Sequence, residues 1–172
     1  MSPKYTLALI LCSSGLLAMG KFGIFSRAPD VESIETADLS EILRQQQQAK
    51  TNTATPGTDT PVADFIVVDV RSAAEVNVSV ILGAITKAHY EANRLQYQDH
   101  TVIPYCTKGV RSGNYAKELA KSGVKVKNYK GSILKWVEAG LPVVTLDGQP
   151  TNRVHTYSNR YQIPAQYQQV TE

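Results

Sequence analysis

Two short apolar runs constrain the fold of this chain more than any other feature. The first is FIVVDV, from Phe65 to Val70, and the second is TVIPYC, from Thr101 to Cys106. Both have the length of a β-strand, are rich in β-branched residues and show little alternation between apolar and polar positions. Such runs are typical of strands that are buried on both faces, as in a parallel sheet.

Segments with helical character lie between and after these runs. Ser72–Val76 begins a short helix, and a helix with one apolar face runs from Ser112 until Gly123 stops it. A further helix is predicted over SILKWVEAG, residues 132–140, and a half-exposed strand over VKVKNY, residues 124–129. The order of strands and helices predicts an α/β fold with an open parallel sheet.

The 172 residues divide into three parts. Residues 1–28 contain an uncharged stretch from Tyr5 to Gly20, which suits the apolar core of a signal peptide and is short for a bilayer span. We expect a signal peptide or membrane anchor there, and an exported protein that is periplasmic or membrane-anchored with its domain outside the cytoplasm. A buried core helix is the alternative. Residues 29–146 form the predicted domain, and residues 147–172 are expected to wrap around it or to be partly disordered.

The distribution of charge says more than its total. The net charge of +3 is too small to indicate nucleic-acid binding, and no stacking aromatics are interleaved in a recognisable binding module. Residues 101–135, however, contain a single acid, Glu118, and eight basic residues: Lys108, Arg111, Lys117, Lys121, Lys125, Lys127, Lys130 and Lys135. This segment is either a solvated basic face or the source of a field that attracts small anions.

Metal and disulfide chemistry find little support in the sequence. Cys12 belongs to the N-terminal apolar segment, so no disulfide with Cys106 is expected. His89, His100 and His155 are scattered, without the spacing of a zinc site, and are interpreted as surface or capping residues. No metal site and no cofactor are predicted.

Cys106 stands at the carboxyl end of the second apolar run, the edge at which open α/β sheets bind ligands. The loop Thr107–Arg111 leads into the next helix, so its backbone N–H groups can form an anion cradle, and Gly109 permits the unusual backbone angles. Lys108 and Arg111 add positive charge, which favours thiolate over thiol. We therefore expect a nucleophile with a lowered pKa. An inert buried cysteine at a strand end is the alternative.

Four segments of the chain resemble the single-domain rhodanese family of sulfurtransferases, in the right order. YCTKGVRS is similar to the family's active-site loop, Cys-x-x-Gly-x-Arg-Ser. VVDVRSAAE and ILGAI resemble its Asp-Val-Arg-Ser-x-x-Glu signature and its Ile-Pro-Gly-Ala segment, and YKGSILKWVEAGLPV resembles its closing motif. The segments lie within Ser33–Val144. The resemblance implies a rhodanese-like open parallel sheet of about five strands with helices on both faces.

The resemblance also implies a reaction. Cys106 would attack the outer sulfur of thiosulfate or a related donor, release sulfite, and pass the sulfur from a persulfide to a thiol or cyanide. Lys108 and Arg111 would steer the anionic donor. The full set of substrate-binding residues that it implies is Thr107, Lys108, Gly109, Val110, Arg111 and Ser112.

Three further residues match the family's signature, and other parts of the chain depart from it. Asp69, Arg71 and Glu75 match and are interpreted as structural, with Arg71 pairing with Glu75 or Asp69. Ser79–Leu82 replaces the family's Gly-His-Ile-Pro, which should alter a loop near the rim of the site. Ser132 replaces the second glycine of a Gly-Gly pair.

The length of the loop bears on the type of reaction. Four residues separate Cys106 from Arg111. The phosphatases and arsenate reductases that resemble rhodaneses have one residue more, which makes room for a tetrahedral oxyanion, so these activities are less favoured here. A non-catalytic rhodanese-like binding or sulfur-carrier module remains an alternative to an enzyme.

Overall fold

The computed structural model describes residues 30–52 and 64–171. The predicted signal peptide or anchor, including Cys12, lies outside these residues. Among the helices that are described, none combines the length and the apolar character needed to cross a bilayer. The helices are α1 Thr36–Asn52, α2 Ala73–Val76, α3 Lys87–Ala92, the 3₁₀-helix η1 Arg94–Tyr97, α4 Val110–Lys121 and α5 Ser132–Glu138. The strands are β1 Phe65–Asp69, β2 Val80–Ile81, β3 Ile85–Thr86, β4 Thr101–Tyr105, β5 Val143–Val144, β6 Pro150–Thr151, β7 Arg153–His155 and β8 Gln168–Val170.

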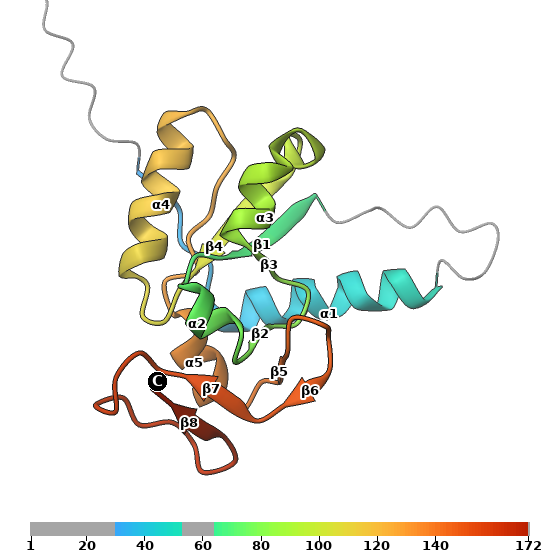
Figure 1. The fold of residues 1–172 in the computed structure, drawn as a ribbon. Coiled ribbons are helices and arrows are strands. Elements are labelled where there is room, and N and C mark those ends of the chain that lie inside the picture. The colour runs from blue at the N-terminus through green and yellow to red at the C-terminus, as the bar shows by residue number, and fades with distance from the viewer. Residues whose placement is uncertain (1–29, 53–63, 172) are drawn as a thin grey trace, which may run out of the picture.

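The central element is a parallel sheet in which β1 lies between β3 and β4 (Figure 1). Two further lines of chain extend the sheet beyond β4 through parallel bridges, which pair Val102 with Val126 and Ser33 with Asn128. The half-exposed strand expected over residues 124–129 is thus reduced to bridges in the sheet. The predicted α/β fold with an open parallel sheet of about five strands is confirmed.

Helices cover both faces of this sheet. Successive side chains of a strand point to opposite faces, and β1 shows this directly, because Val67 and Val68 belong to different cores. The core around Val67 contains residues of α1 and α5, namely Leu39, Leu43, Ile133, Trp136 and Val137. The core around Val68 contains residues of α3 and α4, namely Tyr90, Tyr115 and Leu119. Burial on both faces explains why the strand sequences are almost continuously apolar.

The C-terminal segment folds back onto the domain (Figure 1). β5 pairs with β2 and β6 in a small antiparallel sheet, and β7 and β8 form a parallel pair. Val154 of β7 is fully buried in the same core as Val67. Residues 147–171 therefore wrap around the domain, which is one of the two expectations for the tail. This wrapping brings a tail segment to the edge of the sheet where β4 ends.

Candidate active site

Cys106 directly follows β4 at the carboxyl edge of the parallel sheet. The residue is 2% exposed and lines a cavity of about 300 Å³, which we call the Cys106 pocket. The other lining residues are Thr107, Lys108, Val110, Arg111, Tyr157 and Tyr161. The sulfur is therefore buried from bulk solvent but faces a space large enough for a small anion.

The loop after Cys106 turns its backbone towards the sulfur. The N–H group of Gly109 donates a hydrogen bond to Cys106 Sγ over 3.0 Å. Gly109 has a φ of +92°, and a Cβ atom at this position would collide with the carbonyl oxygen of Lys130. Glycine is required here for both reasons, because other residues rarely adopt this φ and none would fit the space.

These contacts determine the ionisation of the thiol. Burial by itself would raise the pKa of Cys106, because it penalises the thiolate. The backbone N–H groups of Ser112, Lys108 and Gly109 oppose burial, together with the Ser112 hydroxyl, and the net result is a lowered pKa. The loop therefore stabilises the thiolate through backbone dipoles.

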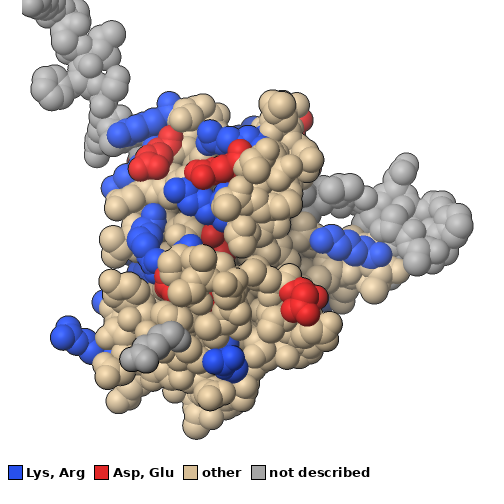
Figure 2. All heavy atoms as spheres, in the orientation of Figure 1, with Lys and Arg blue, Asp and Glu red and all other residues tan. Residues whose placement is uncertain are grey.

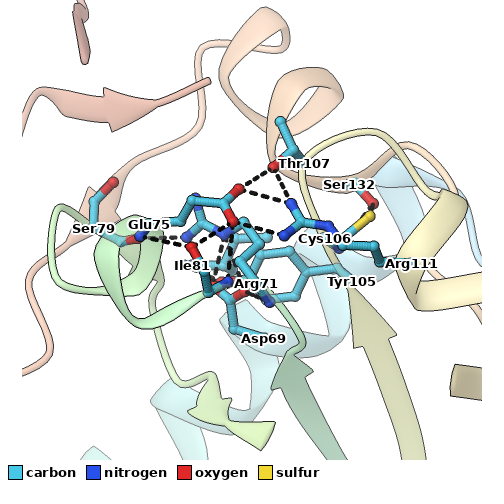
Figure 3. Close-up of polar contacts among 11 residues, drawn as sticks. Asp69, Arg71, Glu75, Ser79, Ile81, Tyr105, Cys106, Thr107, Arg111 and Ser132 are labelled. Atoms are coloured by element: carbon cyan, nitrogen blue, oxygen red, sulfur yellow. Dashed lines mark hydrogen bonds and ion pairs between the residues drawn. The ribbon is translucent and has the colours of Figure 1, made fainter. Parts of the chain in front are cut away.

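Ser132, where the family has glycine, reaches the same sulfur from the start of α5 (Figure 3). Its φ of +55° is in the left-handed region that glycine normally occupies. The hydroxyl accepts a hydrogen bond from Cys106 N–H (3.1 Å), donates to the Tyr129 carbonyl (3.0 Å) and lies 3.8 Å from Cys106 Sγ. The serine thus adds a side-chain contact that a glycine could not make.

Glu75 anchors the opposite side of the loop (Figure 3). Both of its oxygens accept hydrogen bonds of 2.7 Å from Arg111, one also accepts from Thr107 Oγ1 (2.6 Å), and the other accepts from Ser72 N–H (3.0 Å). Burial raises the pKa of this carboxyl, but the donors outweigh it and hold the pKa of Glu75 well below its ordinary value. Arg111 is therefore ion-paired and holds the loop, while its side chain, 39% exposed, remains on the wall of the pocket.

A second ion pair lies deeper, between Asp69 and Arg71 (2.7 Å), with both side chains fully buried. The Tyr105 hydroxyl donates to Asp69 over 2.5 Å, and Arg71 also donates to the Ser79 carbonyl over 2.5 Å. Of the two partners expected for Arg71, the structure shows Asp69 and not Glu75. The pair ties the end of β1 to β4 and to the segment before β2, which fits the structural role expected for it.

The C-terminal segment supplies the outer wall of the pocket. The Tyr157 ring lies 5.7 Å from the Arg111 guanidinium carbon, and the Tyr161 ring lies 5.0 Å from Lys108 Nζ, both in cation–π geometry. His155 is buried, and its Nδ1 accepts a hydrogen bond of 3.0 Å from Tyr157 N–H. This bond restrains the backbone at Tyr157, whose φ is +65°. His155 is thus buried and bonded within the tail, and it is not the surface residue that one of the two expectations describes.

The structure brings all predicted loop residues around Cys106. Four of them line the pocket beside it, namely Thr107, Lys108, Val110 and Arg111. The other two, Gly109 and Ser112, direct N–H groups at the sulfur. Their roles towards a substrate stay predictions.

Sequence reasoning missed the two tyrosines of the outer wall. Tyr157 and Tyr161 lie in a tail without periodicity, where the tyrosine content is the sole signal. The sequence marks Ser132 as a departure from a glycine, but its contact with Cys106 depends on how α5 packs against β4, and no sequence pattern specifies that packing.

Comparison with known proteins agrees with this geometry. The sequence profile of the rhodanese-like domain matches residues 45–139. The chain is also 33% identical over 89 residues to a sulfurtransferase of Allochromatium vinosum, covering 49% of this chain and 83% of that protein. The chain belongs to the rhodanese-like domain family.

Other similarities cover parts of larger proteins or show the fold alone. A tRNA uridine(34) hydroxylase of a Jannaschia species is 31% identical over 85 residues, which cover 44% of this chain and 28% of that protein. A Bacillus halodurans protein (TM-score 0.51, 22% identity, 66% of this chain and 77% of that chain) shares the fold. So does a Pseudomonas aeruginosa thiosulfate sulfurtransferase (TM-score 0.51, 20% identity, 72% of this chain and 21% of that chain). The rhodanese-like chain described here thus spans only a small part of some larger relatives.

Proposed function

We propose that this rhodanese-like protein is a sulfurtransferase that carries a sulfane sulfur on Cys106. The observation that supports this most directly is the thiol of lowered pKa, which accepts a hydrogen bond from Gly109 N–H and faces a pocket of about 300 Å³. A thiol of lowered pKa is more often in the thiolate form, and the thiolate is the nucleophile that this chemistry needs.

In the first step the Cys106 thiolate attacks the outer sulfur of thiosulfate or a related anionic donor. A new S–S bond forms on Cys106, the S–S bond of the donor breaks, and sulfite leaves with the electron pair. In the second step a thiolate or cyanide attacks the outer sulfur of the persulfide. Cys106 leaves as thiolate, so the site returns to its starting state without an external oxidant or reductant.

The local charges suit both steps. The N–H groups around Sγ stabilise the Cys106 thiolate when it leaves, and the Lys108 ammonium, on the wall of the pocket, attracts the anionic donor. Arg111 contributes its charge from the Glu75 ion pair. The Cys106 pocket thus offers a small anion the charge of Lys108 beside the N–H groups that surround the sulfur.

The test measures both the turnover of the enzyme and the mass of the protein. Wild-type protein incubated with thiosulfate should gain the mass of one sulfur on Cys106 and should form thiocyanate when cyanide is added. Cys106→Ser should do neither, and Cys12→Ser should do both. A Cys106 that gains sulfur but never releases it to cyanide or to any thiol would favour the sulfur-carrier alternative. Equal turnover by wild type and Cys106→Ser would contradict the proposal.

We further propose that the protein is exported or membrane-anchored, on the strength of the uncharged stretch from Tyr5 to Gly20. Expression of the full chain, followed by sequencing of the mature N-terminus and fractionation of the cells, tests this. A protein recovered uncleaved from the soluble cytoplasmic fraction would contradict it.

A further inference from the structure

One side chain of the last strand binds the segment that forms the outer wall of the Cys106 pocket. Gln169 belongs to β8, and it lies opposite Val154 of β7, which is fully buried in the main core. After this pair of residues, Thr156 N–H donates a hydrogen bond to the Val170 carbonyl over 3.0 Å. Gln169 therefore belongs to a strand that is fixed to the core.

The amide of Gln169 makes three hydrogen bonds to residues 156–161, which we call the tyrosine loop. Its Nε2 donates to the Thr156 hydroxyl oxygen over 2.8 Å, to the Tyr161 carbonyl over 2.9 Å and to the Ser158 carbonyl over 3.1 Å. Thr156 Oγ1 itself donates to the Ser158 carbonyl over 3.1 Å, so this hydroxyl can only accept from Gln169. All three partners are thus acceptors, and the amide nitrogen is the end of the side chain that satisfies them.

The two tyrosines of the loop differ in how their backbones are held. Tyr157 N–H donates to His155 Nδ1, which does not involve Gln169. Tyr161 N–H donates to the Ser158 carbonyl over 3.3 Å, and that carbonyl is itself bound by Gln169. The Tyr161 carbonyl accepts directly from Gln169. The position of Tyr161 therefore depends on Gln169 more than the position of Tyr157 does.

The side chain of Tyr161 in turn contacts a cation of the Cys106 pocket. Lys108 Nζ lies 5.0 Å from the centre of the Tyr161 ring and 3.5 Å from its hydroxyl oxygen. Among the described residues Lys108 forms no ion pair, whereas Arg111, also on the pocket wall, is paired with Glu75. A lysine side chain is flexible, so an exposed ammonium samples many positions unless a neighbour restricts it. Tyr161 is the neighbour that keeps Lys108 at the pocket.

We propose that Gln169 is a positioning residue of the sulfurtransferase reaction, and that it acts through Tyr161 to hold the Lys108 ammonium where the anionic donor enters. The proposal rests on the sulfurtransferase function proposed above. Gln169 is not among the residues that line the Cys106 pocket, so it reaches a donor only through the tyrosine loop. It should affect the binding of an anion and leave the thiolate unchanged, because backbone N–H groups of the Cys106 loop stabilise the thiolate.

Other basic side chains also attract anions to this side of the molecule, and a control must account for them. Lys and Arg side chains gather over α4 in the view of Figure 2. Lys117 and Lys121 of this helix are exposed but do not line the Cys106 pocket. Removing the charge of Lys117 therefore measures the general field of the surface, whereas a neutral substitution of Gln169 changes no charge.

The first experiment compares two alkylating reagents of similar size, anionic iodoacetate and neutral iodoacetamide. Their rates at Cys106 are measured by peptide mass spectrometry on the full-length protein, and the ratio of the two rates cancels the thiolate fraction and the access to the sulfur. Gln169→Met keeps the length of the side chain but has no donor, and it should lower this ratio about threefold, the effect of one exposed cation–π contact. Gln168→Met, a control at the exposed neighbour in β8, and Lys117→Gln should keep the wild-type ratio.

A double variant tests whether Gln169 acts through Tyr161. Tyr161→Leu removes the ring and the hydroxyl that contact Lys108, and it should lower the ratio about as much as Gln169→Met does. The double variant should show no further fall, because both changes release the same ammonium. Additive falls would overturn the inference, and so would a wild-type ratio in either single variant. If Gln169→Met does not fold, Gln169→Asn takes its place, because an amide that is one methylene shorter cannot keep all three bonds.

Turnover with thiosulfate separates the inference from the proposed function. In Gln169→Met the KM for thiosulfate should rise about threefold, while kcat at saturating cyanide stays within about twofold of wild type. A lower kcat with an unchanged KM would overturn the inference, because the variant would then disturb the sulfur and not the binding of the donor. A wild type that forms no persulfide would overturn the proposed function, and with it the role of Gln169 in the reaction. Normal turnover with an unchanged alkylation ratio in Gln169→Met would overturn the inference alone.

Discussion

Two arginine–carboxylate pairs lie near Cys106, equal in distance and different in exposure. Arg71 and Asp69 approach to 2.7 Å with both side chains at 0% exposure. Arg111 and Glu75 also approach to 2.7 Å, but the arginine side chain is 39% exposed and the glutamate 2%. We call Arg71–Asp69 the closed pair, and it acts only on the fold, because no substrate can reach it. We call Arg111–Glu75 the open pair, and it fixes the Cys106 loop and still presents positive charge to the pocket.

The difference follows from where the two carboxylates stand. Asp69 ends β1 and is enclosed by β4 and the segment before β2, where Tyr105 and Ser79 also bond to the pair. Glu75 is at the start of α2, nearer the pocket, and its partner comes from the loop that carries the sulfur. The two pairs should therefore respond differently when each loses one member.

The largest effect is expected from the closed pair. Arg71→Met leaves Asp69 buried without a cation, and the free energy of unfolding should fall by about 3–5 kcal/mol. Denaturant unfolding measures the loss. The double variant Asp69→Asn with Arg71→Met removes both charges and should recover part of the stability. If the single and double variants were equally stable, the buried charge would not be the cause.

Breaking the open pair should lower the free energy of unfolding by a smaller amount and should change how this free energy depends on pH. In Glu75→Gln the half-exposed Arg111 remains solvated, so a loss of about 1–2 kcal/mol is expected. The folded-state pKa of Glu75 is lowered, so its contribution is fully present above the unfolded pKa of about 4.3 and is lost as the pH falls below it. Unfolding at pH 3 and pH 6 should show a smaller difference for Glu75→Gln than for wild type. An identical pH dependence would refute the role of this carboxylate.

Substitutions of Ser132 distinguish the energetic cost of backbone strain from the cost of losing a hydrogen bond beside Cys106. Ser132→Ala keeps the left-handed residue but leaves Cys106 N–H without its partner, at an expected cost of about 2 kcal/mol. Ser132→Gly loses the same bond but relieves the strain of a φ of +55°, so its cost should be about 1 kcal/mol smaller. Chemical denaturation of both variants checks this. If the glycine variant were the less stable of the two, the strain argument would fail.

The smallest effect should appear at the sulfur itself. Because the pKa of Cys106 is lowered, its alkylation by iodoacetamide should have a lower pH midpoint than that of a free cysteine measured under the same conditions. Ser112→Ala removes one hydroxyl contact, raises the pKa and should slow alkylation at pH 7 by about twofold. Both proteins are compared in a Cys12→Ser background, so that a single thiol reacts. A midpoint at or above that of free cysteine would mean an inert thiol.

The sheet and the Cys106 loop could be predicted because their signals are local. The runs that became β1 and β4 are apolar over a whole strand, and this follows from burial on both faces. Gly109 and the cations of the loop lie within five residues of Cys106, so one short segment carries the chemistry. Asp69 and Arg71 are likewise close together in sequence, and their pairing was one of the two expected.

The rest depends on contacts between distant parts of the chain. Glu75 meets Arg111 across 36 residues, and Ser132 meets Cys106 across 26. Tyr157 and Tyr161 reach the pocket because Val154 is buried in the main core and anchors the tail. The periodicity of apolar side chains and the composition of loops can both be read from a sequence. They decide which helices and strands form and where along the chain a nucleophile lies. The walls of the Cys106 pocket were decided by tertiary packing, because burying Val154 brings the tail onto the sheet edge and no local pattern records that contact.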